Sequence, residues 1–137
     1  QNAPSPAGAK IQVKQMLDSR CAGGIKLRLF QRELVNMNPL MNNTKWNEIR
    51  NAMYGLNDKI QWRTKDIENG YISNWDAEWY YHFIIGGFNT IEWLEIKFTS
   101  KNKEKIISEL VKIHVPGKIL DETIIIYGYS EEPVDYI

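Results

Sequence analysis

The chain has 137 residues, a length that suits a single folded domain. Hydrophobic residues make up 43% of it and charged residues 25%, so the chain can build an apolar core and disorder is excluded as its main state. The 17 basic and 17 acidic residues cancel to a formal net charge of zero, which argues against a dedicated nucleic-acid binder because such proteins usually carry excess positive charge.

Cysteine content and hydropathy indicate the compartment. The single cysteine, Cys21, excludes an internal disulfide and a cysteine-based structural zinc site. No apolar run approaches the roughly 20 residues that a membrane-spanning helix needs, and residues 1–10 are polar and contain proline, unlike a signal peptide. We therefore expect a cytoplasmic protein with no membrane partner, in which residues 1–9 form a flexible tail and residues 10–137 form a single domain.

Hydrophobic periodicity predicts three helices along the chain, at residues 25–36, 44–54 and 101–113. In the first, Leu27, Phe30 and Leu34 recur at helical spacing, although its first five residues alternate and a short strand is the competing prediction. Before the second helix, the side-chain oxygens of Asn42 and its neighbours can cap the first turn, and Gly55 ends the helix.

Runs rich in β-branched and aromatic residues predict four strands, at residues 59–66, 78–85, 91–98 and 123–128. Gly86 and Gly87 separate the second and third runs, which predicts a tight antiparallel hairpin between them. Alternation along the second run assigns its side chains to two faces, with Trp79, Tyr81 and Phe83 on one and Tyr80 and His82 on the other. The order of elements predicts an α+β fold, in which a mostly antiparallel sheet has helices packed against it.

A first candidate site combines Asp76, Glu95 and Lys97. Strand alternation puts Glu95 and Lys97 on one face, and together with the aspartate ahead of the preceding strand they resemble the PD-(D/E)xK nuclease motif. The resemblance implies a metal-dependent nuclease, in which the carboxylates bind magnesium or manganese and the lysine helps to activate the attacking water. The proline that precedes the aspartate in that family is replaced by Trp75, and Glu-x-Lys occurs by chance in many strands, so an ion pair on a solvated strand is the competing interpretation.

A second candidate site combines aromatic and acidic residues around the predicted hairpin: Trp75, Asp76, Glu78, Tyr80 and Glu92. Exposed tryptophan or tyrosine beside carboxylates is typical of a protein-binding hot spot, whereas packing in the core is the default for most aromatic side chains. Aromatic residues flanked by Arg63 and Lys65 could instead stack on nucleobases, but the zero net charge disfavours a nucleic-acid partner. The two histidines, His82 and His114, lie far apart in the sequence, and no metal site is predicted from them.

Five segments of the chain resemble a small bacterial family of uncharacterised proteins: Met41–Trp46, Trp62–Lys65, Trp75–Trp79, Ile91–Ile96 and Ile126–Tyr129. The likeness covers about residues 25–129 and implies no catalytic residues. Small tryptophan-rich α+β proteins of this kind also resemble, at the level of the fold, the immunity proteins of bacterial toxin systems.

The resemblance and the lack of a strong catalytic motif together favour a cytosolic protein-binding module, namely an immunity-type inhibitor that neutralises a cognate toxin by occlusion. Its aromatic and acidic residues would face a basic toxin domain, and neither catalysis nor a cofactor is expected. The alternative is the metal-dependent nuclease that uses Asp76, Glu95 and Lys97. The sequence leaves the oligomeric state open.

Overall fold

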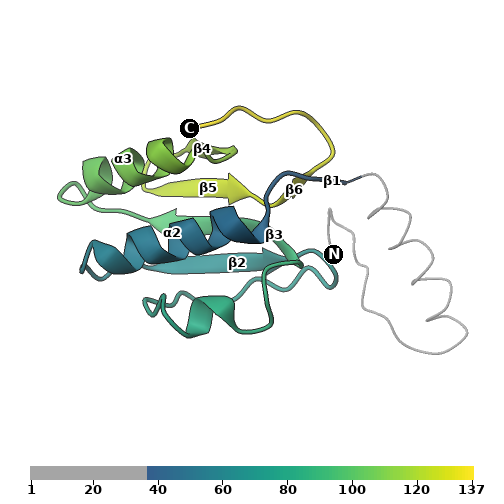
Figure 1. Ribbon diagram of the computed structural model, residues 1–137, viewed down its shortest axis with the longest axis horizontal. Coiled ribbons are helices and arrows are strands. Elements are labelled where there is room, and N and C mark those ends of the chain that lie inside the picture. The colour runs from purple at the N-terminus through teal and green to yellow at the C-terminus, as the bar shows by residue number, and fades with distance from the viewer. Residues whose placement is uncertain (1–36) are drawn as a thin grey trace, which may run out of the picture.

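The computed structural model describes residues 37–137, which form a layer of two helices over an antiparallel sheet (Figure 1). Helices α2 (Asn43–Gly55) and α3 (Lys103–Ile113) pack side by side on one face of the sheet. The sheet has the strand order β2-β3-β5-β4, and these strands span Trp62–Asp66, Ile91–Lys97, Thr123–Tyr127 and Gly117–Ile119. β1 (Asn38–Pro39) and β6 (Tyr129–Ser130) pair separately. The predicted α+β fold is confirmed.

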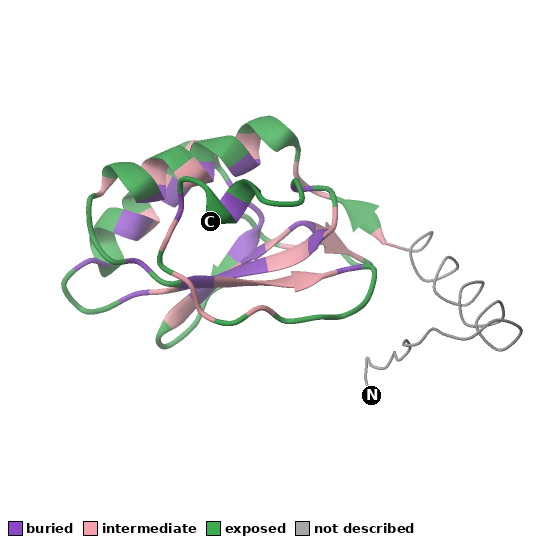
Figure 2. Cartoon of the chain, turned by 90° about the horizontal axis from the view of Figure 1, so that it is seen from below, coloured by how far each residue is buried: buried purple, intermediate pink, exposed green. Residues whose placement is uncertain are grey.

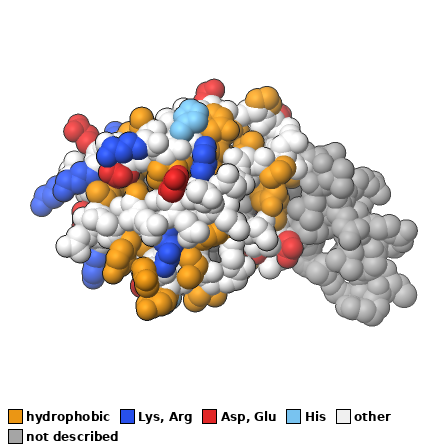
Figure 3. Space-filling model, viewed as in Figure 1, with side chains coloured by type: hydrophobic (Ala, Val, Ile, Leu, Met, Phe, Trp, Pro, Cys, Tyr) orange, Lys and Arg blue, Asp and Glu red, His pale blue; other side chains and the backbone are white. Residues whose placement is uncertain are grey.

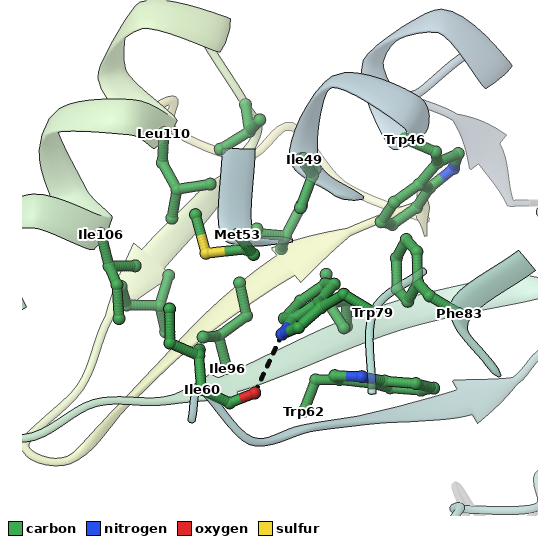
Figure 4. Close-up of a cluster of buried hydrophobic side chains, with 14 of the residues drawn as sticks. Trp46, Ile49, Met53, Ile60, Trp62, Trp79, Phe83, Ile96, Ile106 and Leu110 are labelled. Atoms are coloured by element: carbon green, nitrogen blue, oxygen red, sulfur yellow. Dashed lines mark hydrogen bonds between the residues drawn. The ribbon is translucent and has the colours of Figure 1, made fainter. Parts of the chain in front are cut away.

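The core lies between the helices and the sheet, and Figure 2 shows buried residues in both layers. Helical spacing and strand alternation supply its side chains: Trp46, Ile49 and Met53 from α2, Ile106 and Leu110 from α3, and Leu94, Ile96, Ile124 and Ile126 from the sheet. Figure 4 labels those of the two helices together with Ile96. α2 follows the N-cap residue Asn42, whose Oδ1 accepts the backbone N–H of Lys45 at 2.8 Å. Within the described residues, no helix has the length and apolarity to cross a membrane.

Most predicted elements have a counterpart in the structure. The helices at 44–54 and 101–113 and the strands at 59–66, 91–98 and 123–128 correspond to α2, α3, β2, β3 and β5. The predicted helix at 25–36 and the predicted tail at 1–9 lie outside the described residues.

The predicted strand at 78–85 is wrong, because this stretch is irregular chain followed by the short 3-10 helix η1 (His82–Ile84). Trp79 and Phe83 are each only 3% exposed, and their spacing of four residues suits a helical turn that displays the residues between them. The Glu78 carboxylate accepts two backbone N–H groups of this turn, which favours it over an extended strand. The fourth strand of the sheet is instead β4, which is three residues long and follows α3.

The predicted hairpin at Gly86 and Gly87 is also wrong. Both glycines have positive φ angles, 81° and 79°, and the Gly87 N–H donates to the carbonyl of Ile84 at 3.0 Å. They therefore form a tight turn that leads from η1 toward β3. β3 pairs with β2 and β5, so the two aromatic-rich runs never pair with each other.

Candidate functional site

The predicted partner-binding residues fall in three separate places. Asp76, Glu78 and Tyr80 belong to the segment that leads into η1, at the edge of the sheet beside β2. Trp75 immediately precedes them, but its ring lies near the side chains of strand residues on the sheet face away from the helices. Glu92 is at the start of β3 and forms an ion pair with Lys65 at 3.4 Å. The single patch of these five residues that the predicted hairpin implies therefore does not form.

The three residues of the predicted nuclease motif have other partners. Asp76 forms two backbone hydrogen bonds with Trp62, at 2.7 and 2.9 Å, and this antiparallel pairing places its side chain on the helix side of the sheet. Glu95 is opposite Arg63, on the other face, and its Oε1 lies 2.8 Å from the guanidinium Nε. The Lys97 amine lies 4.3 Å from the centre of the Trp75 ring.

The two carboxylates of that motif consequently point to opposite sides of the sheet. Among residues 37–137, no group of three histidine, cysteine, aspartate or glutamate side chains is arranged to hold a metal ion. The geometry therefore gives the nuclease prediction no support.

Two carboxylates fix the conformation of the segment from Asp76 to Phe83. Asp76 Oδ1 accepts the backbone N–H of Glu78 at 2.8 Å, and its Oδ2 lies 2.8 Å from His82 Nδ1. Glu78 Oε1 accepts the backbone N–H groups of Tyr81 at 2.9 Å and His82 at 2.7 Å, while Oε2 accepts that of Tyr80 at 3.2 Å. Five polar contacts therefore hold one short loop.

Both carboxyl groups have pKa values below their ordinary range. Burial acts to raise the pKa of Asp76, but the Glu78 N–H and the hydrogen bond and charge of His82 together lower it further than burial raises it. The hydrogen bond from the His82 N–H is the main cause of the lowered pKa of Glu78, and the N–H groups of Tyr81 and Tyr80 add to it against some desolvation. Both groups are thus negatively charged at neutral pH.

The loop displays tyrosine rings to solvent. Tyr80 and Tyr81 are 41% and 66% exposed, and Tyr54, in the last turn of α2, is 58% exposed. The ring centres of Tyr54 and Tyr80 are 5.2 Å apart, and those of Tyr80 and Tyr81 are 4.8 Å apart. Ile85, which follows η1, is also largely exposed. We call Tyr54, Tyr80, Tyr81 and Ile85 the tyrosine surface.

Arg50 joins α2 to the tyrosine surface. Its Nε donates to the carbonyl oxygens of Tyr80 at 2.9 Å and Trp79 at 3.2 Å, and a second guanidinium N–H also donates to Tyr80. The guanidinium carbon lies 4.4 Å from the centre of the Tyr80 ring, within cation–π range. Figure 3 shows hydrophobic side chains gathered along the lower edge of the molecule with a basic side chain among them.

Sequence reasoning missed four members of this arrangement: Arg50, Tyr54, Tyr81 and Ile85. Tyr54 and Arg50 lie four residues apart in α2 and outside its buried stripe. An aromatic residue on the polar face of a predicted helix is the sequence signal that could have indicated this surface. The predicted strand places Tyr81 on the same face as Trp79 and Phe83, both of which are buried.

His82, the partner of Asp76, also lines a cavity of about 350 Å³ between the end of β2 and the Gly86–Gly87 turn. The carboxylate orients the imidazole ring, an arrangement that lets a histidine exchange protons at its other nitrogen. Lys65 and Asp66 line the same cavity, so its charges are mixed and favour no single ligand class.

Comparison with known proteins gives one informative result. Residues 29–133 match the model of a protein family that is described as a family of unknown function (DUF6678). No curated protein and no solved structure gives a significant match to the chain.

Proposed function

The chain belongs to the DUF6678 family, whose function is unknown, and we propose that it is a protein-binding module that contacts its partner through the tyrosine surface. One observation carries the proposal: the exposed ring of Tyr54, from α2, lies against that of Tyr80, which in turn contacts Tyr81 on a loop that carboxylates and an arginine hold in place.

The residue types of this surface suit protein recognition. Tyrosine and arginine are enriched at the energetically dominant positions of interfaces, because each offers apolar area together with a polar group. A tyrosine side chain also loses little rotamer freedom when it is bound. The exposed rings of Tyr54, Tyr80 and Tyr81 contact one another in succession, so they form a contiguous apolar patch and not scattered surface residues.

The tyrosine surface is fixed before any partner arrives. Trp79 and Phe83 are buried at the two ends of the displayed turn, and the Trp79 indole N–H donates to the carbonyl of Ile60 at 2.9 Å (Figure 4). A surface that is already ordered loses less conformational entropy on binding, so more of the contact energy appears as affinity.

Charge favours a basic partner. Asp76 and Glu78, both ionised, lie in the same loop as Tyr80 and Tyr81, and opposite charges on a partner would steer its approach. We therefore keep the immunity-type inhibitor as the specific form of this proposal: a cytoplasmic protein that occludes a basic toxin domain.

Calorimetric titration of the full chain with the product of the adjacent gene tests the proposal. We expect Tyr81→Ala to weaken binding by about tenfold or more, because a central interface tyrosine contributes roughly 2 kcal/mol. Tyr71→Ala is the matched control, since Tyr71 is 62% exposed but lies outside the tyrosine surface, and its effect should stay within about twofold. No binding by the native chain, or equal losses in the two variants, contradicts the proposal.

A further inference from the structure

The strand register gathers one set of side chains on the sheet face that no described helix covers (Figure 2). We call it the outer sheet face, and its strand residues are Arg63, Lys65, Trp93, Glu95, Lys97, Lys118, Thr123, Ile125 and Tyr127. It shares no residue with the tyrosine surface, so it is a separate candidate site.

Three aromatic rings lie on this face. Trp93 of β3 is directly opposite Tyr127 of β5 and Lys65 of β2, which makes a row of a cation and two rings across three strands. Trp75 comes from the chain alongside β2, and its ring centre lies 4.6 Å from the Arg63 guanidinium carbon and 4.3 Å from the Lys97 amine. All three rings are half-buried, so each keeps part of its surface open to a ligand.

The charges on the outer sheet face do not cancel. Glu95 is paired with Arg63 at 2.8 Å, and Glu92 is paired with Lys65 at 3.4 Å. Within residues 37–137, neither Lys97 nor Lys118 has a carboxylate partner. Although the net charge of the whole chain is zero, basic side chains therefore outnumber acidic ones on the outer sheet face.

We propose that the outer sheet face binds single-stranded nucleic acid. Bases stack on Trp93 and Tyr127, at the centre of the sheet, and phosphates bind Lys97 and Lys118. Such ligands repeat a flat ring and an anion along one chain, which is the pairing that aromatic side chains flanked by lysines recognise. Trp75 lies between two cations that restrict its ring, so this part of the site is preorganised.

An acidic protein segment is the rival occupant, since it would also be attracted to the lysines. An acidic segment would not stack on the flat rings, however, because it carries flexible carboxylates and no bases. The two occupants therefore differ in whether binding depends on Trp93.

The test measures fluorescence anisotropy of short labelled oligo(U) and oligo(dT) strands with the full chain, at about 50 and 200 mM salt. We expect salt-sensitive binding, and the two strands show whether RNA or DNA is preferred. Trp93→Ala should weaken binding about tenfold, the loss of roughly one stacked base. Lys97→Gln combined with Lys118→Gln should lower the salt slope by about 1.4, or about 0.7 for each phosphate contact.

Two controls isolate the face. Lys105→Gln removes an exposed charge from α3, on the other side of the sheet, and should leave binding unchanged. Tyr81→Ala alters the tyrosine surface and should also bind as the native chain does, so failure of this proposal is distinguishable from failure of the protein-binding one. Circular dichroism verifies that each variant is folded, and the lysine variants still decide the outcome if Trp93→Ala is not.

Three results overturn the proposal. The first is no binding of either strand at the lower salt concentration. The second is an equal loss in Lys105→Gln and in the Lys97 and Lys118 variant, which indicates unspecific attraction. The third is that polyglutamate displaces the oligonucleotide while Trp93→Ala binds the oligonucleotide with native affinity, which assigns the face to an acidic protein segment.

Discussion

The carboxylate of Asp76 contacts the imidazole of His82, with 2.8 Å between Oδ2 and Nδ1. Glu78, which lies between them in the sequence, accepts the backbone N–H of the same histidine at 2.7 Å. The two contacts close a loop of seven residues around the turn that displays Tyr80 and Tyr81. The tyrosine surface therefore depends on two carboxylates that are accessible to solvent protons.

We expect acid to lower the free energy of unfolding through these two carboxylates. Burial acts to raise the pKa of Asp76, but the Glu78 N–H and His82 bring it below 3.8, while the His82 N–H brings that of Glu78 below 4.5. Because both values are depressed in the folded state, the unfolded chain takes up protons first as the pH falls. The stabilisation is therefore complete well above about pH 4.5 and is lost as the pH drops through the folded-state values.

Urea unfolding between about pH 7 and pH 3 measures this dependence. The double variant Asp76→Asn, Glu78→Gln should lose stability less steeply in acid than the native chain does. A matched double variant at Glu131 and Glu132, which are exposed at the carboxyl end, should retain the native slope. Identical slopes for all three proteins would count against a role for the loop carboxylates.

Removal of the Glu78 carboxylate should loosen the displayed turn without unfolding the domain. Glu78→Ala leaves the backbone N–H groups of Tyr80, Tyr81 and His82 without their acceptor. We expect their hydrogen exchange to become faster, while the amides of β3 exchange as before, because local openings need not involve the core strands. Glu78→Gln keeps the acceptor oxygen and should accelerate exchange less. Unchanged exchange in Glu78→Ala would contradict the role of this carboxylate in holding the turn.

The sequence predicts α2, α3 and three of the four strands of the sheet well because their patterns are local. Trp46, Ile49 and Met53 recur at helical spacing, and the β-branched run of isoleucines in β5 favours a strand. β4 could not be predicted, since it is three residues long and begins at Gly117, a residue type that strands disfavour.

The strand prediction for residues 78–85 is wrong for a specific reason. Trp79 and Phe83 are four residues apart, and this spacing puts two side chains on one side in both a helical turn and a strand. The residue midway between them, Tyr81, distinguishes the strand from the helical turn, because it shares their face only in a strand. As an aromatic residue Tyr81 has a strong preference for strands, although it is 66% exposed here. The contact of Tyr54 with Tyr80 joins two elements 26 positions apart, so no local pattern encodes the tyrosine surface.

Trp79 should tolerate little change, because it anchors that surface to the core. Trp79→Phe keeps a ring but removes the indole N–H that donates to the buried carbonyl of Ile60 at 2.9 Å. We expect a loss of about 1–3 kcal/mol in the free energy of unfolding, from the unpaired carbonyl and the smaller ring. Urea denaturation measures it. Tyr71→Phe, at an exposed position, serves as the control and should stay within about 0.5 kcal/mol.

Two glycines should respond in opposite directions to the same substitution. A Cβ atom at Gly128, after β5, would lie 2.1 Å from the backbone oxygen of Ile91 and 3.1 Å from the Trp46 ring, so Gly128→Ala forces β3 and β5 apart. We expect a loss of about 1–3 kcal/mol, as for an overpacked core. At Gly55, in the last turn of α2, no atom lies within 4 Å of the added Cβ, and Gly55→Ala should stabilise by up to about 1 kcal/mol because alanine favours the helix. Paired thermal and urea unfolding of the two variants measures both changes, and a Gly128→Ala protein as stable as the native chain would mean that the strands do not approach as closely as described.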